Sequence, residues 1–153
     1  MSKQQIDVIE LACERDEREL FSAVSFCLQP GDVLQVAGPN GAGKTSLLRI
    51  MAATAGDISF AEKSILSGSG REYWRRNLLY IGHAPAVKSA LTAEENLSWL
   101  CALTRPVSSE AIWQALDQVG LRGFEDVPCR QLSAGQQRRV ALARLYLPGA
   151  PIW

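Results

Sequence analysis

A short run of residues has the composition and spacing needed to hold a chain of phosphates. It consists of Gly38, Pro39, Asn40, Gly41, Ala42, Gly43, Lys44, Thr45 and Ser46. Up to Thr45 it fits the pattern G-x-x-x-x-G-K-[S/T] at every fixed position. Glycine adopts at low cost the backbone angles that turn N–H groups toward phosphate oxygens, and a helix beginning at Lys44 would direct its positive end at the same charge. We expect Lys44 to neutralise the β- and γ-phosphates and Thr45 to ligate Mg²⁺, so this run predicts a nucleotide site.

A second run has the pattern of an anion-binding helix start. It consists of Leu132, Ser133, Ala134, Gly135 and Gln136. Ser133 is expected to be a helix N-cap, and Gln136, three residues later, completes a capping box. A hydroxyl, free backbone N–H groups and the positive end of a helix would then converge on one point, which attracts an anion. Taken alone, this pattern would be better explained as an ordinary capping box.

Together the two runs resemble the phosphate-binding loop and the signature motif of ABC ATPases. The common signature is LSGGQ, in which Ala134 replaces a glycine here. The resemblance implies an α/β fold, a P-loop NTPase of the ABC ATPase type with an antiparallel β subdomain and a helical insertion. It also implies ATP and Mg²⁺ as ligands. The signature would act in trans on the γ-phosphate held by a second ATPase subunit, so that a dimer encloses two ATP molecules.

Further segments resemble the ATP-binding subunits of bacterial haem exporters that serve cytochrome c biogenesis. These segments are Cys13–Arg18, Tyr80–His83, Leu91–Leu97, Gly123–Asp126 and Gln131–Leu145. The resemblance implies a peripheral ATPase that couples ATP hydrolysis to haem export or release. It would dock on haem-exporter membrane subunits at the cytoplasmic face of the bacterial inner membrane, with residues 84–91 as the coupling surface. No direct haem binding is expected, because no haem-ligand spacing accompanies the lone His83. The alternatives are a soluble ABC ATPase that does not transport and a truncated, non-catalytic nucleotide-binding module.

Two positions depart from the general ABC pattern. The residue that opens the Q-loop is usually glutamine, and here that position is His83, the single histidine of the chain. A lone histidine is most often structural, but this one follows a predicted strand where the γ-phosphate, Mg²⁺ and a membrane subunit would meet. The aromatic residue that usually stacks on adenine falls near Arg15, whose guanidinium could stack on a base instead. For the arginines Arg138, Arg139 and Arg144, a solvated helix face is a sufficient explanation.

The elements that would position these residues follow from the apolar pattern and the turn signals. We expect strand, loop, strand over the first thirty residues, a buried strand at Val33–Ala37, and a helix from Lys44 to about Ala55 with Gly56 as its cap. Residues 57–76 are expected to form a surface hairpin and loop, and residues 78–81 another buried strand. Helices are expected to start at Thr92, near Ser109 and at Ser133. These elements divide the chain into a nucleotide-binding core (1–83), a helical signature subdomain (84–147) and the beginning of a further core strand (148–153).

The catalytic machinery that the resemblance implies is not complete within these residues. In ABC ATPases the signature helix is followed by a strand with an aspartate for Mg²⁺ and a glutamate that activates water, whereas this sequence ends at Trp153. We therefore expect the 153-residue chain by itself to be C-terminally incomplete, to bind nucleotide weakly and not to hydrolyse it. Lys44, as a transition-state charge, and His83 are the remaining catalytic candidates.

Composition excludes several other classes of protein. Sixteen basic and sixteen acidic side chains cancel, so we expect no nucleic-acid partner. No stretch is long and apolar enough for a membrane-spanning helix, and the N-terminus lacks the apolar core of a secretory signal. The four cysteines are too far apart for a zinc or covalent haem motif, and we expect buried thiols in a reducing compartment.

Overall fold

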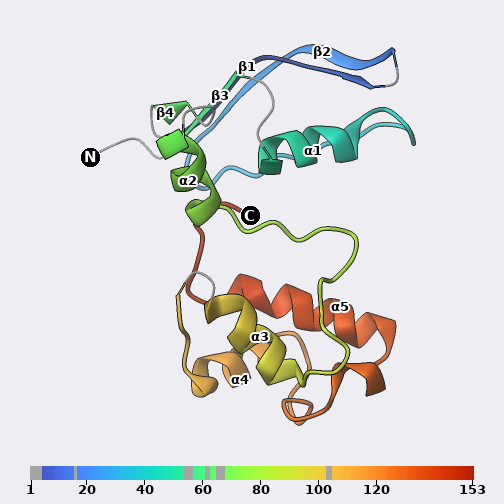
Figure 1. The fold of residues 1–153 in the computed structure, drawn as a ribbon, viewed down its shortest axis with the longest axis vertical. Coiled ribbons are helices and arrows are strands. Elements are labelled where there is room, and N and C mark those ends of the chain that lie inside the picture. Colours follow the sequence, from blue (N-terminus) through green and yellow to red (C-terminus); the bar gives the residue numbers. More distant parts are fainter. Residues whose placement is uncertain (1–4, 16, 54–56, 61–62, 65–67, 103–104) are drawn as a thin grey trace. The chain divides into compact units, whose positions relative to one another are not determined.

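The computed structural model describes residues 5–15, 17–53, 57–60, 63–64, 68–102 and 105–153 (Figure 1). The chain forms two compact units that divide between Arg76 and Asn77. The first unit contains β1 (Ile6–Arg15), β2 (Arg18–Leu28), α1 (Lys44–Ala53), β3 (Asp57–Phe60), β4 (Lys63–Ser64) and nearly all of α2 (Gly68–Asn77). The second contains α3 (Ala93–Ala102), α4 (Ser109–Gln118), the 3₁₀ turn η1 (Cys129–Gln131), α5 (Ala134–Ala143) and the 3₁₀ turn η2 (Arg144–Tyr146). Of the helices in the described ranges, none combines the length and apolar character that crossing a bilayer requires.

An antiparallel sheet of order β2-β1-β3-β4 forms the first unit's scaffold. The predicted strand–loop–strand is confirmed as the β1–β2 hairpin, in which Ile6 pairs with Leu28 and Val8 with Phe26. Alternation puts Ile6 and Val8 on the buried face, and Leu11, which follows a register shift after Val8, is fully enclosed. The strands reach Arg15 and Arg18, so the charged connection is shorter than the sequence suggested.

The two predicted buried strands are not formed as strands, and those predictions are wrong for the described chain. Val33–Ala37 carries no strand pairing, and Val33 is 93% exposed. Residues 78–81 contribute only a single parallel bridge, between Leu78 and Ile152. A strand exists only when a neighbour takes up its backbone hydrogen bonds, and neither apolar run has a paired neighbour along its length.

Of the surface hairpin and loop predicted over residues 57–76, the hairpin is formed, because β3 pairs antiparallel with β4, but the rest needs correction. β3 pairs with β1, where Ile6 lies opposite Phe60, and is therefore an inner strand of the sheet. α2 follows as a helix that the prediction did not include. Trp74 of this helix is fully buried, and its indole N–H donates to the Met51 carbonyl at 2.7 Å, near the end of α1. The helix from Lys44 is confirmed to Ala53, whereas the proposed Gly56 cap lies outside the described residues.

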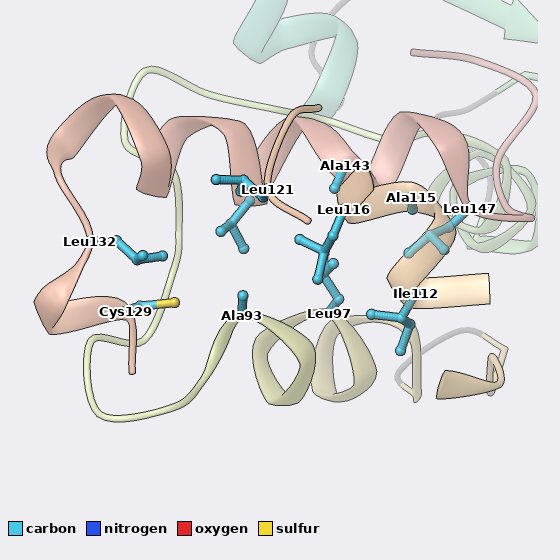
Figure 2. Close-up of a cluster of buried hydrophobic side chains, with 11 residues drawn as sticks. Ala93, Leu97, Ile112, Ala115, Leu116, Leu121, Cys129, Leu132, Ala143 and Leu147 are labelled. Atoms are coloured by element: carbon cyan, nitrogen blue, oxygen red, sulfur yellow. The ribbon is translucent and has the colours of Figure 1, made fainter. Parts of the chain in front are cut away.

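The three predicted helices of the second unit are confirmed, and they surround one apolar core (Figure 2). Its members are Ala93, Leu97, Ile112, Ala115, Leu116, Leu121, Cys129, Leu132, Val140, Ala143 and Leu147. The α3 capping box is closed by Thr92 and Glu95, at 2.8 and 3.1 Å. α4 has Ser108 as its N-cap. Of the four cysteines only Cys129 is buried, which contradicts the expectation of four buried thiols.

Candidate functional site

The loop before α1 has the geometry that phosphate binding requires. Gly41 and Gly43 have φ of +85° and +84°, in the left-handed region that favours glycine. Gly43 also has no room for a side chain, because a Cβ there would lie 3.0 Å from the ring of Phe21 and 3.2 Å from Leu20. The first helical hydrogen bond, from Leu47 N to Gly43 O at 2.8 Å, begins α1 directly after the loop. The preceding N–H groups of the helix start are thus left for an anion.

The Lys44 ammonium lies across this loop. Its Nζ donates to the carbonyl oxygens of Gly38 and Pro39, each at 2.7 Å. These two carbonyls satisfy part of the ammonium's donor capacity and hold the side chain at the site. A phosphate oxygen offers a charged acceptor to the same group, and charge-assisted hydrogen bonds are about twice as strong as neutral ones.

An open cavity of about 520 Å³ adjoins the loop, which is within the range of small-molecule sites. It is lined by Arg18, Leu20, Asn40, Gly41, Gly43, Lys44, Thr45 and Ser46. Three members of the predicted nucleotide-binding run do not line the cavity: Gly38, Pro39 and Ala42. The carbonyls of the first two hold Lys44, and Ala42 N donates to Pro39 O at 3.3 Å within the turn.

Arg18 and Leu20 are cavity residues that the sequence reasoning missed. They are two positions apart on β2, and residues i and i+2 of a strand share a face. The signal that could have identified them is this alternation, since Leu20 and its neighbour Phe21 contact the glycine-rich loop and Arg18 shares the strand face of Leu20. Arg15, the residue predicted to lie near adenine, has a side chain outside the described part of the chain.

The second motif, in the other compact unit, has the predicted capping geometry. The Ser133 hydroxyl accepts from Gln136 N at 3.2 Å, and Ser133 N donates to Gln136 Oε1 at 2.8 Å. Leu132 is buried in the apolar core and anchors this turn, whereas Ser133, Ala134 and Gly135 are exposed. A Cβ on Gly135 would meet no atom within 4 Å. The helix start is therefore accessible to a ligand from outside this unit.

Comparison with known proteins identifies the family of the chain. The family described as ABC transporter matches residues 21–153. The chain belongs to the ABC transporter family. The curated Cytochrome c biogenesis ATP-binding export protein CcmA of Pseudomonas fluorescens is 55% identical over 157 residues, covering all of this chain and 74% of the relative. Its counterpart in Pseudomonas putida is 60% identical over 147 residues (94% and 69% covered), and that of Yersinia pestis is 52% identical over 152 residues (97% and 69%).

Solved structures support the ABC ATPase fold. An ABC transporter ATP-binding protein from Pyrococcus furiosus superposes with a TM-score of 0.80 at 23% identity, over 92% of this chain and 69% of that one. A Clostridium perfringens protein, part of the ABC transporter complex cbiONQ, gives 0.72 at 24% identity, over 94% and 61%. The present chain thus spans about three fifths to three quarters of its relatives' lengths.

His83, the residue that the sequence analysis assigns to the Q-loop position, has an exposed side chain. It belongs to the same compact unit as α5. Its backbone carbonyl accepts a hydrogen bond from Arg138 at 3.3 Å, and that of Gly82 accepts from the same Nη1 atom. The backbone of the Q-loop position is thus tied to the helix of the signature motif.

The expectation that the three arginines merely solvate a helix face is wrong. Arg138 makes the bonds just described. Arg139 donates to the carbonyls of Val119 and Gly120, at 3.2 and 3.1 Å, and so caps the C-terminal end of α4. Arg144 is half-buried, and burial lowers the pKa of its guanidinium. The partners are distant in sequence, which is why local periodicity gave no sign of them.

Proposed function

We propose that this chain is the ATP-binding subunit of an ABC exporter that serves cytochrome c biogenesis. The observation that carries the proposal is the 55% identity across the whole chain to a curated export protein of that name. An ABC ATPase of a transporter works with membrane subunits, and here these would be haem-exporter subunits. The subunit couples ATP hydrolysis to haem export or release, and haem itself contacts the membrane partners.

The loop residues bind the triphosphate. Lys44 neutralises the β- and γ-phosphates, while the N–H groups at the start of α1 and the positive end of its dipole face the same oxygens. The exposed Thr45 hydroxyl lines the cavity and suits Mg²⁺, a cation that prefers oxygen ligands. Mg²⁺ held there would offset the negative charge that develops on the phosphate oxygens. Ser46 lies beside Thr45 on the same cavity wall.

Arg18 and Leu20 take the part of the nucleotide that extends beyond the phosphates. Leu20 lies next to Gly43, and Arg18 is two positions before Leu20, at the start of β2. Leu20 offers an apolar surface to the ribose or base. The planar Arg18 guanidinium can stack on a purine face.

The signature run acts on a second copy of the ATPase. The exposed Ser133 hydroxyl and the N–H groups near Gly135 would meet the γ-phosphate held by the opposite subunit's Lys44 loop. The two subunits would thus enclose two ATP molecules. Residues 84–91 would dock on the membrane subunits, which places the protein peripherally at the cytoplasmic face of the inner membrane.

Two measurements test this function. Lys44→Ala should weaken Mg-ATP binding by about 10- to 100-fold in calorimetry, the loss expected for a charge-assisted contact. In bacteria lacking their own subunit, the wild-type gene should restore cytochrome c carrying covalent haem, and the Lys44→Ala gene should not. Equal affinity of variant and wild type contradicts the nucleotide site. Binding without restoration contradicts the biological role.

The arrangement in trans is tested by co-expressing a Ser133→Ala gene with a Lys44→Ala gene. Each variant alone spoils both sites of a homodimer. The mixed dimer has one doubly altered site and one intact site if Lys44 and Ser133 of different subunits share a site. Partial recovery of cytochrome c maturation is expected. Absence of recovery, with mixed dimers demonstrated, argues for sites completed within one chain.

A further inference from the structure

The stretch from Leu78 to Thr92 belongs to the helical unit although it contains no helix. Apart from the bridges at its two ends, the stretch has no regular pairing. Its backbone is instead held by bonds from the rest of the unit, beginning with Leu79 N to Ile152 O at 2.8 Å. These hydrogen bonds fix the position of His83, the predicted Q-loop residue, within the unit.

Arg138 makes the first side-chain attachment. It lies on α5, five residues after Ser133, and its Nη1 donates to two successive carbonyls, those of Gly82 and His83. The side chain is half-buried. A guanidinium has a planar array of donors that can serve neighbouring acceptors, whereas an ammonium is a point charge on a flexible stem. Arg138 therefore fixes two consecutive peptide groups to the helix that carries the signature.

Asn96 makes the second attachment, at the other end of the stretch. This fully buried side chain accepts from Lys88 N at 2.7 Å and donates to the carbonyls of Lys88 and Thr92, at 3.0 and 2.9 Å. Backbone bonds strengthen the same end, from Cys129 N to Leu91 O at 2.9 Å and from Arg130 N to Ser89 O at 2.8 Å. This end is consequently anchored to both α3 and η1.

Between the two attachments Ala84 and Ala86 are exposed, whereas Val87 is partly buried. Ala86 has a φ of +54°, which is rare for a residue with a Cβ. Such a conformation persists only where the surrounding structure imposes it. Here Val87 packs on the apolar core on one side, and the Arg138 bonds hold the backbone on the other.

We propose that Arg138 is a positioning residue that joins the backbone at Gly82 and His83 to α5. The stretch from His83 to Leu91 then moves as one body with the signature helix. A displacement of Ser133, at the start of α5, is then transmitted to the exposed turn around Ala86 through the Arg138 hydrogen bonds. The inference rests on the proposed function only for its activity readout, since the attachment itself is measurable in any state of the protein.

The structural test is the carbonyl ¹³C chemical shift of Gly82 and of His83, which reports on the hydrogen bonds that each carbonyl accepts, compared between the wild type and Arg138→Gln in the full chain. Loss of both bonds should move both shifts upfield, toward those of carbonyls that accept only from water. Arg138→Lys should recover part of the difference, because it keeps a charged donor but not the planar guanidinium. Arg139→Gln is the matched control on the same helix. It should move the carbonyl shifts of Val119 and Gly120 at the end of α4 and leave those of Gly82 and His83 unchanged.

The functional test is ATP turnover by the full-length protein assembled with its membrane subunits. Arg138→Gln should leave KM for ATP within about twofold and lower kcat by about tenfold, since the variant alters movement of the stretch and leaves the Lys44 loop intact. Unchanged carbonyl shifts of Gly82 and His83 overturn the attachment. Equal changes in kcat and KM, or a kcat equal to wild type although both shifts have moved, overturn the positioning role. Loss of nucleotide binding by Lys44→Ala tests the proposed function separately.

Discussion

Replacement of Asn96 by alanine should destabilise the helical unit more than any surface change on α3. The Nδ2 group has two hydrogens, so it can serve two acceptors well at one time, and the shortest are Thr92 O at 2.9 Å and Lys88 O at 3.0 Å. The Oδ1 atom accepts a third bond, from Lys88 N. At about 1 kcal/mol for each bond, the loss is about 3 kcal/mol, and the void left by the side chain adds to it.

This loss would be a large fraction of the ~5–15 kcal/mol by which domains are stable. The assay measures the free energy of unfolding in urea, monitored by hydrogen exchange of peptides from α3, α4 and α5, so that it reports on this unit alone. Ser98→Ala, at an exposed position of the same helix, is the matched control and should change stability by less than about 0.5 kcal/mol. A deficit for Asn96→Ala within about 1 kcal/mol of that control would refute the reasoning.

Asn96→Asp distinguishes the hydrogen bonds from the void. The aspartate keeps an acceptor for Lys88 N but turns its second oxygen toward carbonyl oxygens, so burial and repulsion raise its pKa in the folded state. A group with a raised folded pKa favours folding only while it is protonated. The variant should therefore lose stability as pH rises from about 4 to 7, relative to wild type. Equal stability of variant and wild type at neutral pH would contradict the role of the amide donor.

Three shorter predictions concern other sites. Arg18→Ala should weaken ATP binding about three- to tenfold but leave inorganic tripolyphosphate binding unchanged, because the guanidinium faces the part of the nucleotide beyond the phosphates. Equal losses for both ligands in calorimetry would place Arg18 at the phosphates instead. Ser133→Asp should keep the unfolding midpoint of wild type, since aspartate also caps a helix, yet abolish turnover by repelling the γ-phosphate; Ser133→Ala should cost about 1 kcal/mol of stability. A fully active aspartate variant would contradict the anion-binding role. Hydrogen bonds from Ser109 and then Trp113 lower the pKa of Glu94. A carboxyl group whose pKa is lower in the folded than in the unfolded state stabilises the fold at pH values above its unfolded pKa, and this stabilisation is lost as pH falls through the folded pKa. Trp113→Phe should therefore reduce the difference between the free energies of unfolding measured at pH 7 and pH 3.

The sequence alone determined the features that depend on neighbouring residues. The phosphate-binding loop, with Gly43 and Lys44, is a local conformation followed by a helix, and its geometry agrees with the prediction. The capping boxes at Thr92 and Ser133 close across three residues, and both are formed. Short-range backbone satisfaction requires no partner from elsewhere in the chain, which is why such patterns can be interpreted directly.

Only the tertiary structure decided the features whose partners are far apart in the chain. Val33–Ala37 has the composition of a buried strand, but composition cannot supply the neighbouring strand that its N–H and C=O groups need. α2 is polar on average and has no apolar run, and it depends on the burial of Trp74. Arg138 resembles a solvated helical arginine until its acceptors, more than fifty residues earlier, are known. Long-range hydrogen bonds and burial are properties of the assembled unit, and no local pattern in the sequence specifies which distant residue completes them.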